Sequence, residues 1–589
     1  MLFMLNNLRE KTKNFVTKPF SRLFSSEVNK TQKKLYETLK GDIKPIIDDL
    51  EKINDSYASL IGGEITYIID GNYKIAQQFF PDVKKGPITQ EHIDTFLTNL
   101  KIAQNTLTVH IDSLKKSPLP PYTKQLFLNR CEEIQENMTM LSYSVYIEAE
   151  KGGYSIDPAE RENIIKNTQD KLWTAFGPSV SSNKEESQQC VDKMVLYFNK
   201  NGNRLTEEEK TLFQGFLDAC CQKYSLTQKK KSTTDSDEEE KSDNASESIL
   251  LKTITRQKQQ ELFEILQQTE RSDPINTKPQ RTMKPRKIEL DKIQKNVTVC
   301  SEKEKIYLPD DAKTISLESA LVNYQHEIGK HATSGYNANH FFVKGRKGAG
   351  YLGLEEGLAK LFEAIVKGKV KTLADIPSIT EKPSIGMLAT FICEQCNYDE
   401  AVKIITIYNK LTRKPEGQTK KTKTPEEEAH NIVTRRKRFV PYDRPGASTK
   451  DCLYTRGLRD VAAMFNKCTN IKEAYKLLHT INFAKLGPKD IPHTEAIKKE
   501  LGINDDDIFT TTFLPRRIIQ DIQDQEGTKK YPSRIEAIRD RILKKVGLRK
   551  KTFDDMHNAN KDQRKFWGPY KHHPITNITK KILEQNPKK

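Results

Sequence analysis

The chain has 589 residues, of which 98 are Lys or Arg and 80 are Asp or Glu, so its net charge is +18. At roughly 150 residues per domain, this length predicts two to four domains and is ample for a sizeable core. The sequence contains no run of about 18 apolar residues, which excludes a helical membrane-spanning protein. Leu, Ile and aromatic residues recur at helical spacing in long blocks, which excludes a collagenous or wholly disordered chain.

The first 27 residues form a basic tail, with five Lys or Arg and one acid before Ser26. We interpret it as an amphipathic start, and a mitochondrial transit peptide is the alternative. The nine cysteines are sparse and irregularly spaced, which is typical of a reducing compartment. We therefore expect a cytoplasmic protein.

The remaining chain divides by composition into four parts. Their limits are 28–225 for a helical N-terminal region, 226–290 for an irregular insert, 291–515 for a catalytic region and 516–589 for a basic appendix. One helix is predicted from about Tyr122 to Glu150, and another resumes near Leu250 within the insert. Two short strands are expected at residues 297–299 and 306–308, and a low-complexity insert at about 410–438. The predicted fold class is α+β, predominantly helical, with short antiparallel strands.

A candidate metal site lies on the helix that follows Ser316, a plausible N-cap. The segment His326-Glu327-Ile328-Gly329-Lys330-His331 is one residue longer than the zinc-binding motif H-E-x-x-H. Residues five apart on an α-helix are rotated by about 140°, so both imidazoles reach one metal only where the turn widens. A π-bulge widens it, and Gly329 lowers the steric cost.

A third ligand is expected from a helix downstream of this one. Glu355 and Glu356 open the next clear helix, and a carboxylate there would complete a His₂Glu zinc site. His340 is a rival third ligand. From the residues alone, the choice of third ligand between Glu355, Glu356 and His340 remains open.

These residues resemble a known family. HEIGKH followed by EEGLA is similar to the signature of the tyrosine-type carboxypeptidases, which include the microtubule-associated tyrosine carboxypeptidases and bacterial members with a QEGLA motif. Asn337 matches a family Asn, and residues 444–454 resemble its later Pro-Gly, Lys-Asp and Tyr block. Weaker similarity in residues 123–177 extends the match to about 115–500. The loop between His331 and Glu356 is shorter and richer in Gly and Lys than the animal members have.

The resemblance implies a zincin-like metallocarboxypeptidase that removes a C-terminal residue from a protein. It implies Zn²⁺ held by His326, His331 and Glu356, with Glu327 as the general base. A carboxypeptidase also needs a cation for the terminal carboxylate of its substrate. The candidates for substrate binding are Lys450, Tyr454, Arg456 and Asn337. If the source is eukaryotic, the expected substrate is the acidic tail of α-tubulin.

Other motifs compete with this interpretation. Residues 348–353 match the nucleotide-binding pattern G-x-G-x-x-G, but Glu355 and Glu356 in the first turn of the next helix would repel a phosphate. Cys393 and Cys396 form a lone C-x-x-C, which lacks the second pair of a zinc ribbon.

The appendix after Arg516 mixes basic and aromatic residues, as some nucleic-acid binders do, but it contains no recognised binding motif. We interpret it as a solvated tail that docks on the core. The alternatives to the enzyme are a catalytically silent regulatory protein on the same scaffold and a nucleic-acid binder.

Overall fold

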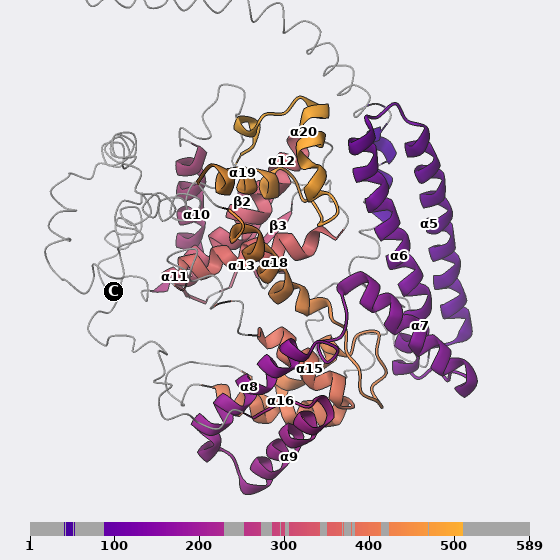
Figure 1. Cartoon of the computed structure of the whole chain (residues 1–589), viewed down its shortest axis with the longest axis vertical. Helices are drawn as coiled ribbons and strands as arrows, with labels where there is room; N and C mark the ends of the chain where they lie inside the picture. The colour runs from indigo at the N-terminus through magenta and orange to yellow at the C-terminus, as the bar shows by residue number, and fades with distance from the viewer. Residues whose placement is uncertain are drawn as a thin grey trace, which may run out of the picture.

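The computed structural model describes residues 88–228, 253–271, 286–300, 305–341, 350–367, 383–413, 423–468 and 471–509, with gaps at 295 and 312, and scattered positions from 41 to 53 and at 369 and 379. Helices dominate, and the strands are few and short (Figure 1). The predicted helix-rich α+β class is confirmed at this level. The basic N-terminal tail and the C-terminal appendix lie outside the described residues.

Two helices of the N-terminal half form a long hairpin, and a third helix lies across one end of it (Figure 1). They are α5 (Gln90–Lys116), α6 (Pro121–Lys151) and α7 (Pro158–Phe176). Pro121 opens α6 at a position where a helix needs no backbone donor, and the helix predicted from about Tyr122 is thereby confirmed. Leu100 and Leu107 of α5 are buried with Phe127 of α6, so apolar packing holds the hairpin together.

A second group joins helices that are far apart in the sequence. It contains α8 (Lys184–Asn201), α9 (Glu207–Tyr224), α15 (Ile385–Gln395), α16 (Tyr398–Thr412) and α17 (Pro425–Arg436). These helices share one apolar core, so the predicted region 28–225 is divided between two groups. The expected low-complexity insert is also partly wrong, because α17 begins within it behind a capping box at Thr424.

A small sheet supports the candidate site. Its order is β2 (Lys287–Asp291), β4 (Lys305–Pro309), β3 (Thr298–Cys300), with β2 parallel and β3 antiparallel to β4. The predicted strand pair is β3 and β4, with Val299 opposite Ile306. The parallel strand was not predicted. A separate pair joins β1 (Thr253–Ile254) to β5 (Ile315–Ser316).

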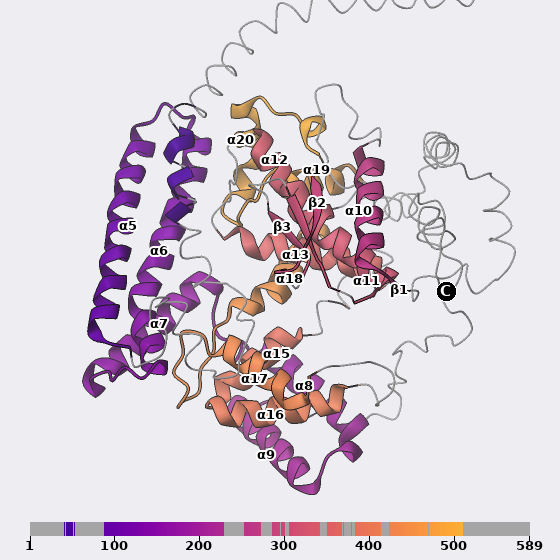
Figure 2. The ribbon, with the colours of Figure 1, turned by 180° about the vertical axis from the view of Figure 1, so that it is seen from behind.

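The boundary predicted at residue 290 is too late. Helix α10 (Arg256–Arg271) packs beside the three-stranded sheet (Figure 2). Its Leu262, Phe263 and Leu266 are buried in one core with Ile306 and Leu308 of β4. Part of the expected insert therefore packs with the region that follows residue 290.

The remaining α-helices and the π-helix include those that carry the candidate site. They are α11 (Leu317–Asn323), a π-helix (Tyr324–Ala332), α12 (Thr333–Phe341), α13 (Tyr351–Val366), α18 (Leu453–Phe465), α19 (Ile471–Asn482) and α20 (Thr494–Leu501). Helices α13 and α18 cross in close contact and share a core with α19.

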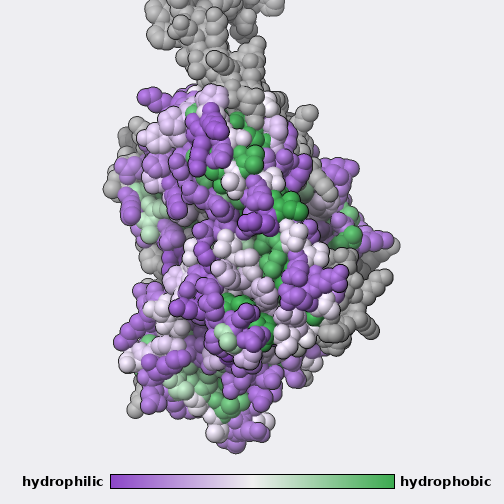
Figure 3. All heavy atoms as spheres, turned by 90° about the vertical axis from the view of Figure 1, so that its right-hand side faces the viewer, coloured by the Kyte–Doolittle hydropathy of each residue, from purple (hydrophilic) through white to green (hydrophobic). Residues whose placement is uncertain are grey.

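The surface on the α5 side is mainly hydrophilic, with scattered apolar spots (Figure 3). Among the described helices, none combines the length and the hydropathy that crossing a bilayer requires.

Candidate metal centre

The two motif histidines lie on a π-helix. Ser316 caps α11 by accepting the backbone N–H of Ser319 at 3.1 Å, as predicted. The helix then widens over Tyr324–Ala332, so the expected widened turn is present. Tyr324 and Ile328 face the core beneath the sheet. The wide turn brings His326 and His331 together, with 3.2 Å between their Nε2 atoms.

Glu356 of α13 completes a cluster of three potential ligands. Its Oε2 lies 3.5 Å from Nε2 of His326, and its Oε1 lies 3.6 Å from Nε2 of His331. In a tetrahedral zinc site with bonds of about 2.0–2.1 Å, neighbouring ligand atoms are about 3.3 Å apart. The three distances therefore suit one small cation. In the described part of the chain, no other group of His, Cys, Asp and Glu has this property.

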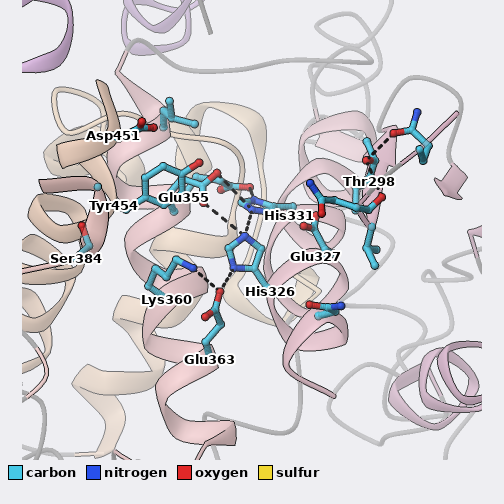
Figure 4. A pocket seen from close by; sticks show the side chains of 18 of the residues that line it. Thr298, His326, Glu327, His331, Glu355, Lys360, Glu363, Ser384, Asp451 and Tyr454 are labelled. Atoms are coloured by element: carbon cyan, nitrogen blue, oxygen red, sulfur yellow. Dashed lines mark hydrogen bonds and ion pairs between the residues drawn. The ribbon is translucent and has the colours of Figure 1, made fainter. Parts of the chain in front are cut away.

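Each histidine also contacts a carboxylate through its other nitrogen (Figure 4). Nδ1 of His331 lies 3.0 Å from Oε1 of Glu355, and Nδ1 of His326 lies 2.7 Å from Oε1 of Glu363. Such partners fix the tautomer and the ring orientation of metal-binding histidines. The sequence had offered Glu355 as a rival ligand, and the structure gives it this supporting position instead.

The surroundings of both supporting carboxylates favour their ionised form. Burial opposes the charge of Glu355, but the charges of Lys330 and Lys485 hold its pKa well below the usual range. Lys330 Nζ lies 2.9 Å from Glu355 Oε2. Burial also opposes the charge of Glu363, and the hydrogen bond with His326 and the charge of Lys360 lower its pKa to about 2.

Ionised carboxylates accept hydrogen bonds and do not donate them, so these contacts favour the tautomer with the ring proton on each Nδ1 atom. The two Nε2 atoms then present lone pairs to each other and to Glu356. Oε2 of Glu356 is buried and has no hydrogen-bond partner among the described residues. Three acceptors that converge in this way require a cation, or an additional proton, between them. The donor set therefore fits a metal.

Glu327 lies beside the histidine pair and lines a cavity of about 980 Å³ with them. Burial raises the pKa of Glu327, against the opposing effect of His331 and His326. In Figure 4, Glu327 and Thr298 lie on one side of the histidine pair, and Tyr454 lies on the other. The cavity therefore extends to both sides of the cluster.

The close crossing of α13 and α18 brings Tyr454 to the cavity. A Cβ atom on Gly357 would lie 2.2 Å from the carbonyl oxygen of Gly457, and one on Gly457 would lie 1.8 Å from that of Gly353. Gly353 thus belongs to a helix crossing and not to a phosphate-binding loop. Helix α13 begins at Tyr351, so Glu355 and Glu356 lie beyond its first turn and not within it as predicted. Only Gly at 357 and 457 permits this approach.

Three predicted site residues do not line the cavity. Asn337 is buried in a structural role: its Nδ2 donates to the carbonyl oxygens of Asn482 at 2.5 Å and Phe509 at 2.8 Å. Arg456 faces away and donates to both carboxylate oxygens of Glu186. Lys450 lies next to Asp451, which does line the cavity.

The rival ligand His340 is also excluded from the cluster, because it is exposed and its ring stacks on Tyr336. Cys393 and Cys396 are buried without a disulfide, and burial raises their pKa values to about 11 and about 12. Neither thiol is suited to redox chemistry in this state.

Sequence reasoning missed Glu363 and the ion pair of Lys330. Glu363 follows Glu356 by seven residues, which is two helical turns and therefore the same face of α13. That spacing was a usable signal. Nothing in the sequence indicated that Lys330, inside the motif, is 1% exposed and paired with Glu355.

No family model matches the chain, and neither the curated proteins nor the solved structures contain a match.

Proposed function

We propose that the protein is a zinc-dependent carboxypeptidase with a zincin-like catalytic region. The observation that carries this proposal is the convergence of His326, His331 and Glu356, whose facing atoms are all acceptors. The supporting carboxylates and the adjacent Glu327 add what a hydrolytic metal site needs beyond its ligands. The resemblance to tyrosine-type carboxypeptidases is consistent with this chemistry and suggests an acidic protein tail as the substrate.

When bound, zinc polarises a carbonyl and makes water a nucleophile at neutral pH. The residues of the chain do the rest. Glu327 accepts the proton of the attacking water and returns it to the leaving amine, a role favoured by its raised pKa. Glu355 and Glu363 hold the two imidazoles in the required tautomer. Tyr454, on the opposite side from Glu327, is suited to donate a hydrogen bond to the developing oxyanion.

The test compares the full chain with Glu327→Gln and His326→Ala. Metal content is measured by elemental analysis after dialysis, and cleavage is measured by mass spectrometry with a short Glu- and Gly-rich peptide ending in tyrosine. We expect the wild type to bind one zinc ion and release tyrosine. Glu327→Gln should keep the metal and lose cleavage, because only the base is removed. His326→Ala should lose both.

Glu261→Gln, on the exposed face of α10, is the matched control and should behave as the wild type does. Equal cleavage by the wild type and Glu327→Gln would remove Glu327 as the base. A wild type that binds no zinc would contradict the proposal. A protein that binds zinc and cleaves no peptide would instead indicate a silent member of this scaffold.

A further inference from the structure

The charge balance of the cavity is uneven at the end formed by α15, α17 and α18. The cations that line the cavity are Arg256, Lys360, Arg435, Arg436 and Lys485. Arg256 pairs with Asp311. Lys360 shares Glu363 with His326, and Lys485 shares Glu355 with Lys330. Asp451 is shared by two arginines that both line the cavity.

The geometry of this cluster is well defined. Arg435 contacts Asp451 through two bonds, Nε to Oδ2 at 2.9 Å and Nη2 to Oδ1 at 2.7 Å. Arg436 pairs with the same carboxylate and donates through Nε to the carbonyl oxygen of Gly386 at 3.3 Å. The Arg435 side chain is 36% exposed and that of Arg436 is 8% exposed. Arg435 is therefore the more accessible of the two arginines that line the cavity.

Lys450 adds a third cation behind the pair. Burial lowers its pKa to about 8, and the charges of Arg435 and Arg438 act in the same direction against the attraction of Asp451. One carboxylate therefore serves several cations in a partly desolvated environment. A surplus of positive charge in such a place favours binding of an anion.

The cluster also lies at a suitable place relative to the metal cluster. In Figure 4, Asp451, Ser384 and Tyr454 lie on the same side of the histidine pair, and Glu327 lies on the other. A substrate that spans the cluster would direct one end towards Asp451 and its arginines. Gly386 packs closely against this cluster, because a Cβ atom on it would lie 3.3 Å from both Arg436 and Asp451.

We infer that Arg435, held by Asp451, binds the terminal carboxylate of the substrate. This inference rests on the proposed carboxypeptidase function and deepens it by naming the residue that would recognise the free C-terminus. It also transfers to Arg435 the role that the sequence had suggested for Arg456, which is bound to Glu186 outside the cavity. Arginine suits this role because its planar guanidinium matches a carboxylate.

The test uses three versions of the Glu- and Gly-rich peptide ending in tyrosine: the free acid, its C-terminal amide, and the free acid with the penultimate Glu replaced by Gln. Wild type, Arg435→Gln and Arg435→Lys are compared by kcat/KM for each peptide. Binding of the same peptides to Glu327→Gln and to the double variant with Arg435→Gln is measured by calorimetry, which separates recognition from cleavage. Zinc content and the unfolding midpoint confirm that each variant is folded.

We expect the wild type to prefer the free acid over the amide. Arg435→Gln should lower kcat/KM for the free acid by about 10- to 100-fold, mainly through KM, and lose the preference. Arg435→Lys should recover part of it. Arg444→Gln removes an arginine paired with Glu162 outside the cavity and should change nothing.

Two results would overturn the inference and leave the peptidase intact. One is a wild type that cleaves the amide as well as the acid. The other is an Arg435→Gln variant that keeps its preference for the free acid. If the effect of Arg435→Gln follows the penultimate Glu instead, the anion is a side chain and the terminal assignment is wrong. Absence of cleavage together with intact Arg435-dependent binding would contradict the proposed function alone.

Discussion

Gly357 of α13 and Gly457 of α18 lie in backbone contact, so that a single methyl group at either position would overlap the other helix. This contact carries Tyr454 to the same cavity as Glu356, although the two residues are almost 100 positions apart in the chain. The geometry of the candidate site thus depends on two residues that contribute no chemistry to it.

Gly357→Ala should therefore destabilise the protein by about 1–3 kcal/mol, because overpacking forces the two helices apart. Cleavage should fall as well, since Tyr454 is displaced. Chemical unfolding followed by circular dichroism measures the first effect. Gly215→Ala in α9 is the matched control: nothing lies within 4 Å of the added Cβ, so stability should stay the same or rise slightly. Equal stability of the two variants would contradict the tight crossing.

The two supporting carboxylates should respond differently to loss of charge. Glu363→Gln should weaken zinc binding by about 10- to 100-fold with little effect on folding. Glu355→Gln should weaken zinc binding and also cost about 3–5 kcal/mol of stability, because Lys330 is left buried without its partner. Competition with a chelator measures the first quantity, and denaturant unfolding of the metal-free protein measures the second. Equal stability of the two metal-free variants would argue against the Lys330 ion pair.

Asn337 should behave as a structural residue. Asn337→Ala removes two donated bonds and one accepted from the backbone N–H of Phe509 at 3.0 Å. We expect a loss of about 2–4 kcal/mol in unfolding free energy. At a temperature where the variant is folded, its KM should match the wild type. A raised KM with unchanged stability would restore Asn337 as a substrate-binding residue.

Glu394 should make stability depend on pH. Burial raises its pKa to about 7, although it accepts the backbone N–H groups of Val180 and Ser181, each at 2.8 Å. Between its ordinary value of 4.5 and about 7, the folded state retains a proton that the unfolded state releases. The contribution of this group therefore favours folding below that window, declines as pH rises through it, and is constant above it.

Glu394→Gln should remove this dependence. The difference in unfolding free energy between the variant and the wild type should shift by about 3 kcal/mol in favour of the variant from pH 4 to pH 8. Measuring both proteins by denaturant titration at several pH values tests this. A difference that does not change with pH would show that folding leaves the pKa of Glu394 at its ordinary value.

The sequence predicted the local features of the site well. The cap at Ser316, the wide turn between the histidines and the strand pair β3–β4 all follow from short-range rules of spacing. The resemblance selected Glu356 over Glu355, and the structure brings Glu356 into the cluster.

Features that depend on which side of a helix faces the cavity were not predictable in the same way. Tyr454 and Arg456 are two residues apart on α18, so their side chains point about 200° apart and only one can face the cavity. The sequence grouped both as substrate-binding residues. Likewise, the packing of α10 and β2 against β4 required knowledge of contacts between distant segments.

The wide turn of the motif has an effect beyond bringing the two histidines together. It inserts an additional residue into a continuous rod, so α12 is out of phase with α11 by about 100° around their common axis. The first part of the rod, through Ala332, packs into the core beneath the sheet, whereas Ala338 belongs to the core formed with Phe483 and Ile508. One rod can therefore join two cores that face different directions, and the histidine motif marks the point where it changes from one to the other.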